Sequence, residues 1–175
     1  MIRFINRLVK PRIFSCRIPK GRPGTMKTAA IIASMIRAGA KDFYVRQRAI
    51  GIFREANVPA KARRAEVEAL FRWVQKNIRY TRDIFRVELL HTPRRMLELR
   101  AGDCDDMTIL LGSMLLSTGH PVRLALTGFR ADRPHHYSHI FPEAQVAGRW
   151  IPLDATMPHP SGWEPPSRWK RTIEV

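Results

Sequence analysis

Residues 101–108 read Ala-Gly-Asp-Cys-Asp-Asp-Met-Thr, and a helical pattern of apolar residues begins directly after them. Asp103 stands where the N-cap of this helix is expected, and Asp106 follows three residues later, near the helix start. The apolar residues that supply the buried face are Ile109, Leu110, Met114 and Leu115. Gly119 is typical of a helix C-cap. The pattern therefore predicts a helix that ends near residue 117 and carries Cys104 in its first turn.

A cysteine in this position is suited to nucleophilic chemistry. The unpaired N–H groups of a helix start favour the thiolate over the thiol, and they also point at a substrate oxygen. Gly102 lets a substrate backbone approach without meeting a Cβ atom. We interpret Cys104 as the candidate nucleophile, Asp103 as the cap of its helix and Gly102 as a substrate-positioning residue.

The three aspartates beside Cys104 restrict this interpretation, because carboxylates aimed at the sulfur would raise its pKa. We expect Asp103 and Asp106 to turn toward backbone N–H groups. Asp105 is expected to face solvent or an arginine. The arginines considered for it are Arg94, Arg95 and Arg100.

A histidine and an aspartate follow in distinct local contexts. His139 lies in the strand-like stretch Tyr137-Ser138-His139-Ile140-Phe141, and Asp154 ends the stretch Trp150-Ile151-Pro152-Leu153-Asp154. A nucleophilic thiol, a base and a carboxylate that orients the base require these three residue types. His135 and His136 are the rival bases, and Asp154 has an alternative role as the cap of the turn at residues 155–156.

The flanking pattern predicts an α+β fold in which N-terminal helices precede a small antiparallel sheet. Residues 79–92 are mixed and expected to be extended or looped, and Ala147-Gly148 is expected to form a hairpin turn. Upstream helices are predicted over residues 25–38, 42–56, 61–78 and 94–99. Strands are predicted over residues 122–128, 137–146 and 149–153.

At 175 residues the chain is long enough for one domain with tails. We assign residues 1–24 to a basic N-terminal arm, 25–156 to the catalytic domain, and 157–175 to a basic C-terminal tail rich in proline and tryptophan. The two cysteines, Cys16 and Cys104, are too few for a disulfide framework and are expected to be reduced thiols. With no membrane-spanning run and no signal-peptide core, a cytoplasmic location is expected.

The charge balance is strongly basic, with 31 Lys and Arg against 15 Asp and Glu and a net charge of +16. Such a balance indicates an anionic partner docked on the basic termini, or a composition that serves solubility alone. No nucleic-acid-binding motif accompanies the charge, so nucleic acid is not indicated.

The motif Gly102-Asp103-Cys104-Asp105-Asp106, His139 in a strand, and Trp150-Ile151-Pro152-Leu153-Asp154-Ala155-Thr156 together resemble the transglutaminase-like cysteine-protease superfamily. The helical stretch at residues 70–80 is similar to the segment that these domains carry upstream of the cysteine. The resemblance covers roughly residues 43–156. Less specifically, the whole chain is similar to small transglutaminase-like proteins of phages and prophages.

The resemblance implies a papain-like order, with a helix bearing the nucleophile packed on an antiparallel sheet bearing the base and the orienting carboxylate. It also implies a peptide or protein amide as substrate. Ile140 departs from the pattern, since many members carry an aromatic residue directly after the histidine. The second oxyanion donor, commonly an upstream tryptophan, has no evident counterpart, because Trp73 lies inside a predicted helix. Tyr80, His91 and Thr92 are the candidates for it.

We therefore expect thiol-dependent acyl transfer on amide bonds, with hydrolysis favoured by the resemblance. The alternatives are a protein cross-linking transglutaminase and a binding or assembly module with little turnover. A metal site is disfavoured, because no CxxC or HExxH spacing is present. The residues considered for it are Asp103, Cys104, Asp106, His135, His136 and His139. No cofactor and no metal are expected.

Overall fold

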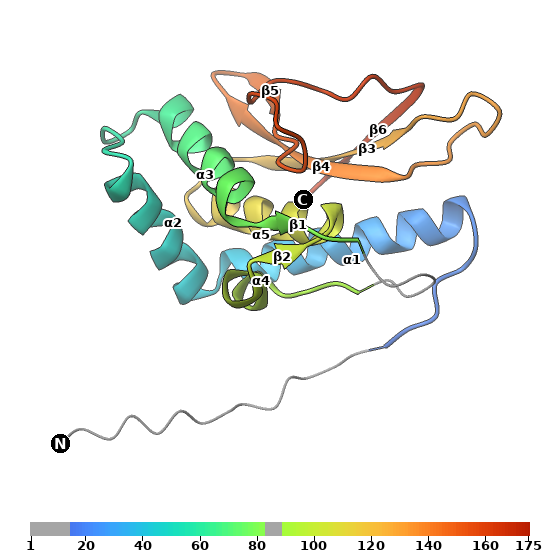
Figure 1. Cartoon of the computed structure of the whole chain (residues 1–175), viewed down its shortest axis with the longest axis horizontal. Coiled ribbons are helices and arrows are strands. Elements are labelled where there is room, and N and C mark those ends of the chain that lie inside the picture. The colour runs from blue at the N-terminus through green and yellow to red at the C-terminus, as the bar shows by residue number, and fades with distance from the viewer. Residues whose placement is uncertain (1–14, 83–88) are drawn as a thin grey trace.

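The computed structural model describes residues 15–82 and 89–175. In these ranges five helices pack against a four-stranded antiparallel sheet, as the α+β prediction requires (Figure 1). The helices are α1 (Arg22–Ala40), α2 (Phe43–Glu55), α3 (Arg63–Asn77), α4 (Pro93–Leu99) and α5 (Cys104–Ser117). The strands of the sheet are β3 (Val122–Gly128), β4 (His139–Val146), β5 (Arg149–Pro152) and β6 (Trp169–Glu174).

Helix α5 lies at the centre of the fold. It packs against the other four helices and against β4, and almost every residue along it is buried. One apolar cluster joins α5 to α2, α3 and β5, and a second joins it to α1, β3 and β4. Because the apolar residues run all round α5, the helix reads as an interior element rather than an amphipathic surface one.

The sheet has the strand order β5-β4-β3-β6, and each neighbouring pair is antiparallel. The hairpin between β4 and β5 turns at Ala147 and Gly148, whose φ angles are 50° and 77°. Two consecutive positive φ angles are the signature of a tight hairpin turn that matches the twist of its strands, so the predicted turn is confirmed.

A two-stranded parallel ladder lies beside the N-terminal end of α5. It consists of β1 (Arg79–Tyr80) and β2 (Ala101–Gly102), with Tyr80 opposite Gly102. The backbone N–H of Thr81 donates to the carbonyl of Gly102 at 2.8 Å. The ladder therefore fixes the segment after α3 against the residues that enter α5.

Both ends of the chain differ from their predicted organisation. Residues 1–14 of the predicted arm lie outside the described ranges, and α1 begins at Arg22, with a proline in its first turn, instead of at Thr25. Residues 157–175 were predicted to be a tail, but Trp169–Glu174 form β6 and pair with β3 along its whole length. Trp169 and Ile173 pack against the second apolar cluster, which is why this basic segment adds a strand to the sheet.

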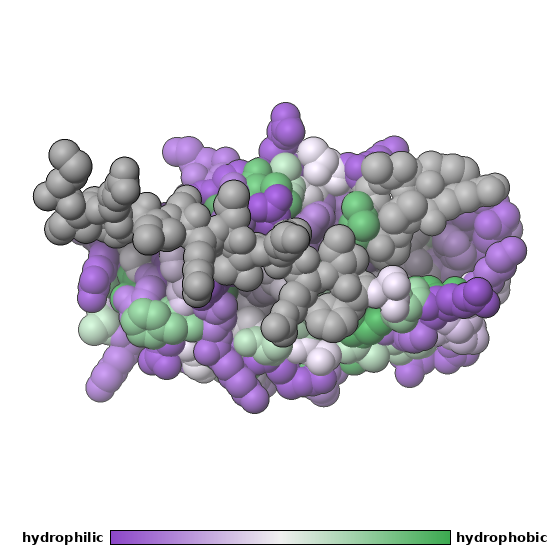
Figure 2. Space-filling view, turned by 90° about the horizontal axis from the view of Figure 1, so that it is seen from below, coloured by the Kyte–Doolittle hydropathy of each residue, from purple (hydrophilic) through white to green (hydrophobic). Residues whose placement is uncertain are grey.

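In the part of the chain that the structure describes, no helix is both long enough and apolar enough to cross a membrane. On the face seen in Figure 2, hydrophilic residues project around smaller, separate groups of hydrophobic ones.

Candidate active site

Cys104 is the first residue of α5, as the sequence predicted. The carboxylate of Asp103 caps the helix by accepting hydrogen bonds from the N–H groups of Asp105 at 2.9 Å and Asp106 at 3.2 Å. Cys104 is partly buried and packs at the border of the cluster that joins α1 to β3 and β4. The helix start thus holds the thiol at the junction between the helices and the sheet.

His139 begins β4, and its imidazole is bound to Asp154. Nε2 lies 2.7 Å from Oδ2 of Asp154, a carboxylate that is only 2% exposed. Oδ1 of the same carboxylate accepts hydrogen bonds from the N–H group of Thr156 at 3.1 Å and from its hydroxyl at 2.6 Å. Asp154 therefore fixes the ring of His139 and at the same time caps the following turn.

The charge state of Asp154 follows from these contacts. Burial raises the pKa of a carboxyl, but the hydrogen bonds and charge of His139 and the donors of Thr156 outweigh burial, and the pKa of Asp154 lies below its usual range. The group is a carboxylate at neutral pH. It can hold the Nε2–H tautomer of His139, which leaves Nδ1 available for proton transfer.

Two contacts bring the helix start to the strand that carries His139. The hydroxyl of Thr108 donates to the carbonyl of Ile140 at 3.2 Å, and Cys104 packs against the apolar cluster that contains Ile140. Ile140 directly follows His139, so Cys104 lies against the beginning of β4. The rival bases His135 and His136 are exposed in the preceding turn, where the ring of His135 lies 5.3 Å from that of Trp169.

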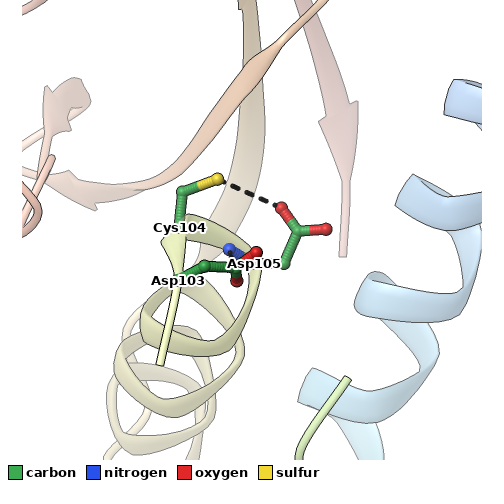
Figure 3. A group of neighbouring side chains, drawn as sticks. All are labelled: Asp103, Cys104 and Asp105. Carbon is green, nitrogen blue, oxygen red and sulfur yellow. Dashed lines mark hydrogen bonds between the residues drawn. The ribbon is translucent and has the colours of Figure 1, made fainter. Parts of the chain in front are cut away.

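Asp105 is buried and does not face solvent, so that part of the expectation is wrong. Its side chain is 8% exposed, and Oδ1 accepts a hydrogen bond from Sγ of Cys104 at 3.3 Å (Figure 3). Burial, followed by the charges of Asp105 and Asp103, raises the pKa of Cys104 well above that of a free thiol. The N–H of Ile140 acts in the opposite direction but does not compensate. The resting sulfur is therefore a thiol rather than the thiolate expected from the helix start.

Asp106 turns toward a backbone N–H group, as expected, but that group belongs to His91 and not to the start of α5. Asp106 is fully buried, and its two carboxylate oxygens hold His91: Oδ1 accepts from the backbone N–H at 2.8 Å, and Oδ2 lies 2.9 Å from Nδ1. The same carboxylate fills the space beside Gly102, where an added Cβ would lie 2.6 Å from Oδ2 and from Cε of Met96. Packing inside the protein thus requires the glycine, independently of any substrate.

The three candidates for the second oxyanion donor have different surroundings. The hydroxyl of Thr92 caps α4 by accepting from the N–H of Arg95 at 3.3 Å, and His91 is held by Asp106. Tyr80 is 44% exposed, and its pKa is raised, first by partial burial of the hydroxyl and then by the charge of Cys104. Tyr80 is therefore near enough to Cys104 for the charge of an ionised sulfur to affect the pKa of its hydroxyl.

Two aromatic rings flank His139, and the sequence interpretation did not include them. Phe141 is buried with its ring 5.9 Å from the imidazole, and Phe129 is 43% exposed at 6.4 Å. Phe141 shares a strand face with His139 because it lies two residues further on. An aromatic residue thus stands at position 141, one position later than the family pattern places it. The alternation of side chains along a strand was the sequence signal that could have identified Phe141 as a neighbour of His139.

One acidic grouping surrounds the thiol within the described residues. The ligand-type atoms of Asp103, Cys104 and Asp105 lie within 4.8 Å of one another (Figure 3). This set is not the six-residue set considered from the sequence, since Asp106 and the histidines are absent from it. Helix capping by Asp103 and the thiol contact of Asp105 account for the arrangement, and we assign no metal site to it.

A surface hollow with a volume of about 730 Å³ lies elsewhere, between the start of α3 and residues 160–161. Arg64, Glu68 and Arg72 line it, and no residue of the Cys104 site takes part. This hollow is therefore separate from the thiol site.

The helix that begins with Cys104 packs on an antiparallel sheet in which His139 begins β4, and Asp154 lies just after β5. Comparison with protein families agrees, since the transglutaminase-like superfamily matches residues 48–155. That range is more than half of the chain, and the chain belongs to the transglutaminase-like superfamily.

Two solved structures are similar to parts of this chain. A putative protease from Parabacteroides distasonis is 12% identical with a TM-score of 0.57, over 76% of this chain and 27% of that one. A putative cysteine protease from Cytophaga hutchinsonii is 21% identical with a TM-score of 0.49, over 64% of this chain and 37% of that one. The chain thus spans well under half the length of either protein. No curated protein matches it.

Proposed function

We propose that the protein is a thiol-dependent amidase or peptidase in which Cys104 is the nucleophile, His139 the base and acid, and Asp154 the residue that orients the base. The observation that carries the proposal is the 2.7 Å hydrogen bond between His139 and Asp154, since His139 directly precedes Ile140, a member of the apolar cluster against which Cys104 packs. A carboxylate that fixes an imidazole beside a thiol is the arrangement that nucleophilic catalysis needs.

In the proposed reaction, Nδ1 of His139 takes the proton of the Cys104 thiol as Sγ attacks the amide carbonyl. The resulting imidazolium is stabilised by the carboxylate of Asp154 and gives its proton to the leaving amine. A thioester on Cys104 remains. Water, deprotonated by His139, then attacks the thioester and releases the acid, which restores the thiol.

The carbonyl oxygen of the substrate becomes negatively charged when Sγ attacks, and this oxyanion requires hydrogen-bond donors near Sγ. Asp103 already engages the N–H groups of Asp105 and Asp106 through its side chain, and that of Met107 through its carbonyl. We assign the first donor to the backbone N–H of Cys104. The second is assigned to the hydroxyl of Tyr80, which β1 holds opposite Gly102.

Hydrolysis and transfer to an amine share the thioester and differ only in the acceptor. The family relationship supports acyl transfer at Cys104, and hydrolysis is the form that we propose. A cross-linking transglutaminase would instead incorporate a primary amine. Offering a fluorescent amine beside a glutamine-containing protein separates the two products by mass.

The test is release of amine from a library of peptide amides by the wild-type protein and by Cys104→Ala. The chain offers a matched control in Cys16→Ala, because Cys16 is exposed and outside the proposed site. We expect Cys104→Ala to abolish turnover and Cys16→Ala to retain it. Turnover that survives Cys104→Ala contradicts the proposal.

A second candidate function is an assembly or binding module that docks on an anionic partner. The raised pKa of Cys104 favours it, since a resting thiol is a weak nucleophile, and the net charge of +16 supplies the attraction. Partner binding that falls steeply as salt increases, in a protein whose Cys104→Ala variant binds equally well, would support this alternative.

A further inference from the structure

The contact between Cys104 and Asp105 is unusual for a residue in the role of a nucleophile. Adjacent residues at the start of α5 share an Sγ–Oδ1 hydrogen bond of 3.3 Å in which the thiol is the donor (Figure 3). The carboxylate is 8% exposed, so little water screens it. A hydrogen bond from the thiol to a buried carboxylate stabilises the protonated sulfur, so the thiol proton is harder to remove.

The titratable groups around the sulfur come from three elements. Asp103 and Asp105 belong to the start of α5, Tyr80 comes from β1, and His139 with its partner Asp154 stands beside Ile140 of β4. The carboxyl groups of Asp103 and Asp105 both oppose loss of the thiol proton. Asp103 is committed to capping the helix, whereas Asp105 contacts the sulfur itself.

We propose that Asp105 is a positioning residue that holds Cys104 as a resting thiol, so that the sulfur must leave Asp105 before it reacts. This inference rests on the proposed function, because keeping Cys104 protonated affects catalysis only if Cys104 is the nucleophile. Activation breaks the S–H bond and forms an N–H bond on His139. The electron pair stays on sulfur, and Asp105 remains a carboxylate throughout.

The arrangement makes reactivity depend on what enters the site. A small electrophile that leaves Asp105 in place meets a protonated sulfur at neutral pH. A substrate that draws Sγ toward its carbonyl breaks the contact and brings the proton within reach of His139. The unproductive reaction of the thiol with small oxidants and alkylating agents is accordingly suppressed.

The experiment is the rate of Cys104 alkylation by iodoacetamide from pH 5 to 10, followed by peptide mass mapping. It compares wild type with Asp105→Asn, which keeps the shape of the side chain and removes its charge. Asp103→Asn retains a helix cap while removing the neighbouring charge, and Asp132→Asn is a remote control on an exposed, arginine-paired aspartate. Cys16 in the same sample is the internal reference.

We expect wild-type Cys104 to react more slowly than Cys16 at pH 7, with a midpoint above that of a free thiol. Asp105→Asn should lower the midpoint by about one pH unit or more, which is about a tenfold faster reaction at pH 7. Asp132→Asn should leave the profile unchanged. Ultraviolet titration of the thiolate in the Cys16→Ala background measures the wild-type midpoint directly, so the inference stays testable if Asp105→Asn does not fold.

A wild-type midpoint at or below that of Cys16 overturns the inference, and so does an Asp105→Asn profile that coincides with wild type. Failure of the proposed function is a separate result. A shifted profile without amidase activity in any variant upholds the role of Asp105 and rejects hydrolysis. Amidase activity with an unshifted profile upholds hydrolysis and rejects the role of Asp105.

Discussion

Nε2 of His139 and Oδ2 of Asp154 are 2.7 Å apart, and the carboxylate also holds the N–H and hydroxyl of Thr156. One buried aspartate thus joins the start of β4 to the turn that follows β5. The ring of His139 is fixed by a partner that is itself fixed, and this rigidity is what a proton-transfer group requires.

Replacing Asp154 by Asn should preserve the shape of this junction while removing the charge and allowing the other imidazole tautomer. We expect kcat to fall by about 10²-fold to 10⁴-fold with KM little changed, because the imidazolium loses its stabilising partner. Steady-state kinetics on the best peptide substrate measures it. An unchanged kcat would show that Asp154 serves only the turn.

His139→Ala should abolish turnover, and the two neighbouring histidines provide matched controls. His135 and His136 are exposed in the turn before β4, so His135→Ala and His136→Ala should retain most of the activity. Alkylation of the thiol over a pH range adds a readout that is independent of substrate. If either exposed histidine is required instead, the assignment of the base is wrong.

Tyr80→Phe removes only the hydroxyl assigned to the oxyanion. Loss of one such donor costs about 10²-fold to 10³-fold in kcat, and because Tyr80 is 44% exposed we expect about 10²-fold with KM nearly constant. Tyr44→Phe, at another exposed tyrosine on α2, is the control. A change confined to KM would indicate substrate binding without oxyanion stabilisation.

His120 makes the stability of the fold depend on pH. It is fully buried, with Nε2 2.9 Å from Oε2 of Glu66, and burial followed by the charge of Arg63 lowers its pKa, although Glu66 opposes the shift. The unfolded state, with a pKa near 6.5, binds a proton that the folded state does not. The contribution to stability is therefore complete above about pH 6.5 and is lost as the pH falls through the lower folded-state pKa.

Urea unfolding at a series of pH values from 7.5 to 5 tests this dependence. The free energy of unfolding should fall on acidification by up to about 1.4 kcal/mol per pH unit, the limit for one proton. His120→Asn should flatten that slope, while His136→Asn, at an exposed position, should not. Parallel slopes in all three proteins would rule out His120 as the source.

Glu143 joins three strands of the sheet. It is 1% exposed on β4 and accepts from Arg123 of β3 at 2.5 Å and from Lys170 of β6 at 2.7 Å. Burial raises its pKa, but these two partners outweigh burial and keep it a carboxylate. Glu143→Gln should lower the free energy of unfolding by about 1–3 kcal/mol, because two cations lose their partner.

The control for this change is Glu98→Gln, in the exposed pair with Arg95, which should alter stability by less than about 1 kcal/mol. Denaturant unfolding at pH 7 measures both variants. Equal effects of the two substitutions would mean that Glu143 contributes no more than a surface pair.

The central part of the fold could be predicted because its signals are local. Asp103 is a typical N-cap at the start of α5, and the alternation of apolar and polar residues indicates the strands. Ala147-Gly148 indicates the hairpin turn, so short stretches of sequence carry the information. The places of Cys104, His139 and Asp154 were equally predictable, since Cys104 begins α5, His139 begins β4 and Asp154 lies just after β5.

What the sequence analysis missed depends on contacts between distant segments. Asp105 resembles a surface charge, and only packing of α5 within the fold turns it against the thiol. Strand β6 was hidden by a proline-rich, basic composition, and its place is set by pairing with β3, more than forty positions earlier. Local propensity carries no information about such partners.

The pairing of β6 with β3 also sets the time at which the site is completed during synthesis. Cys104 leaves the ribosome well before His139 and Asp154, and the sheet that carries them gains its fourth strand only when Trp169–Glu174 follow. A nascent chain thus presents its thiol for many residues without the partners that would activate it. Under the proposed function, the nascent chain would therefore be unable to hydrolyse amides until the polypeptide is almost complete.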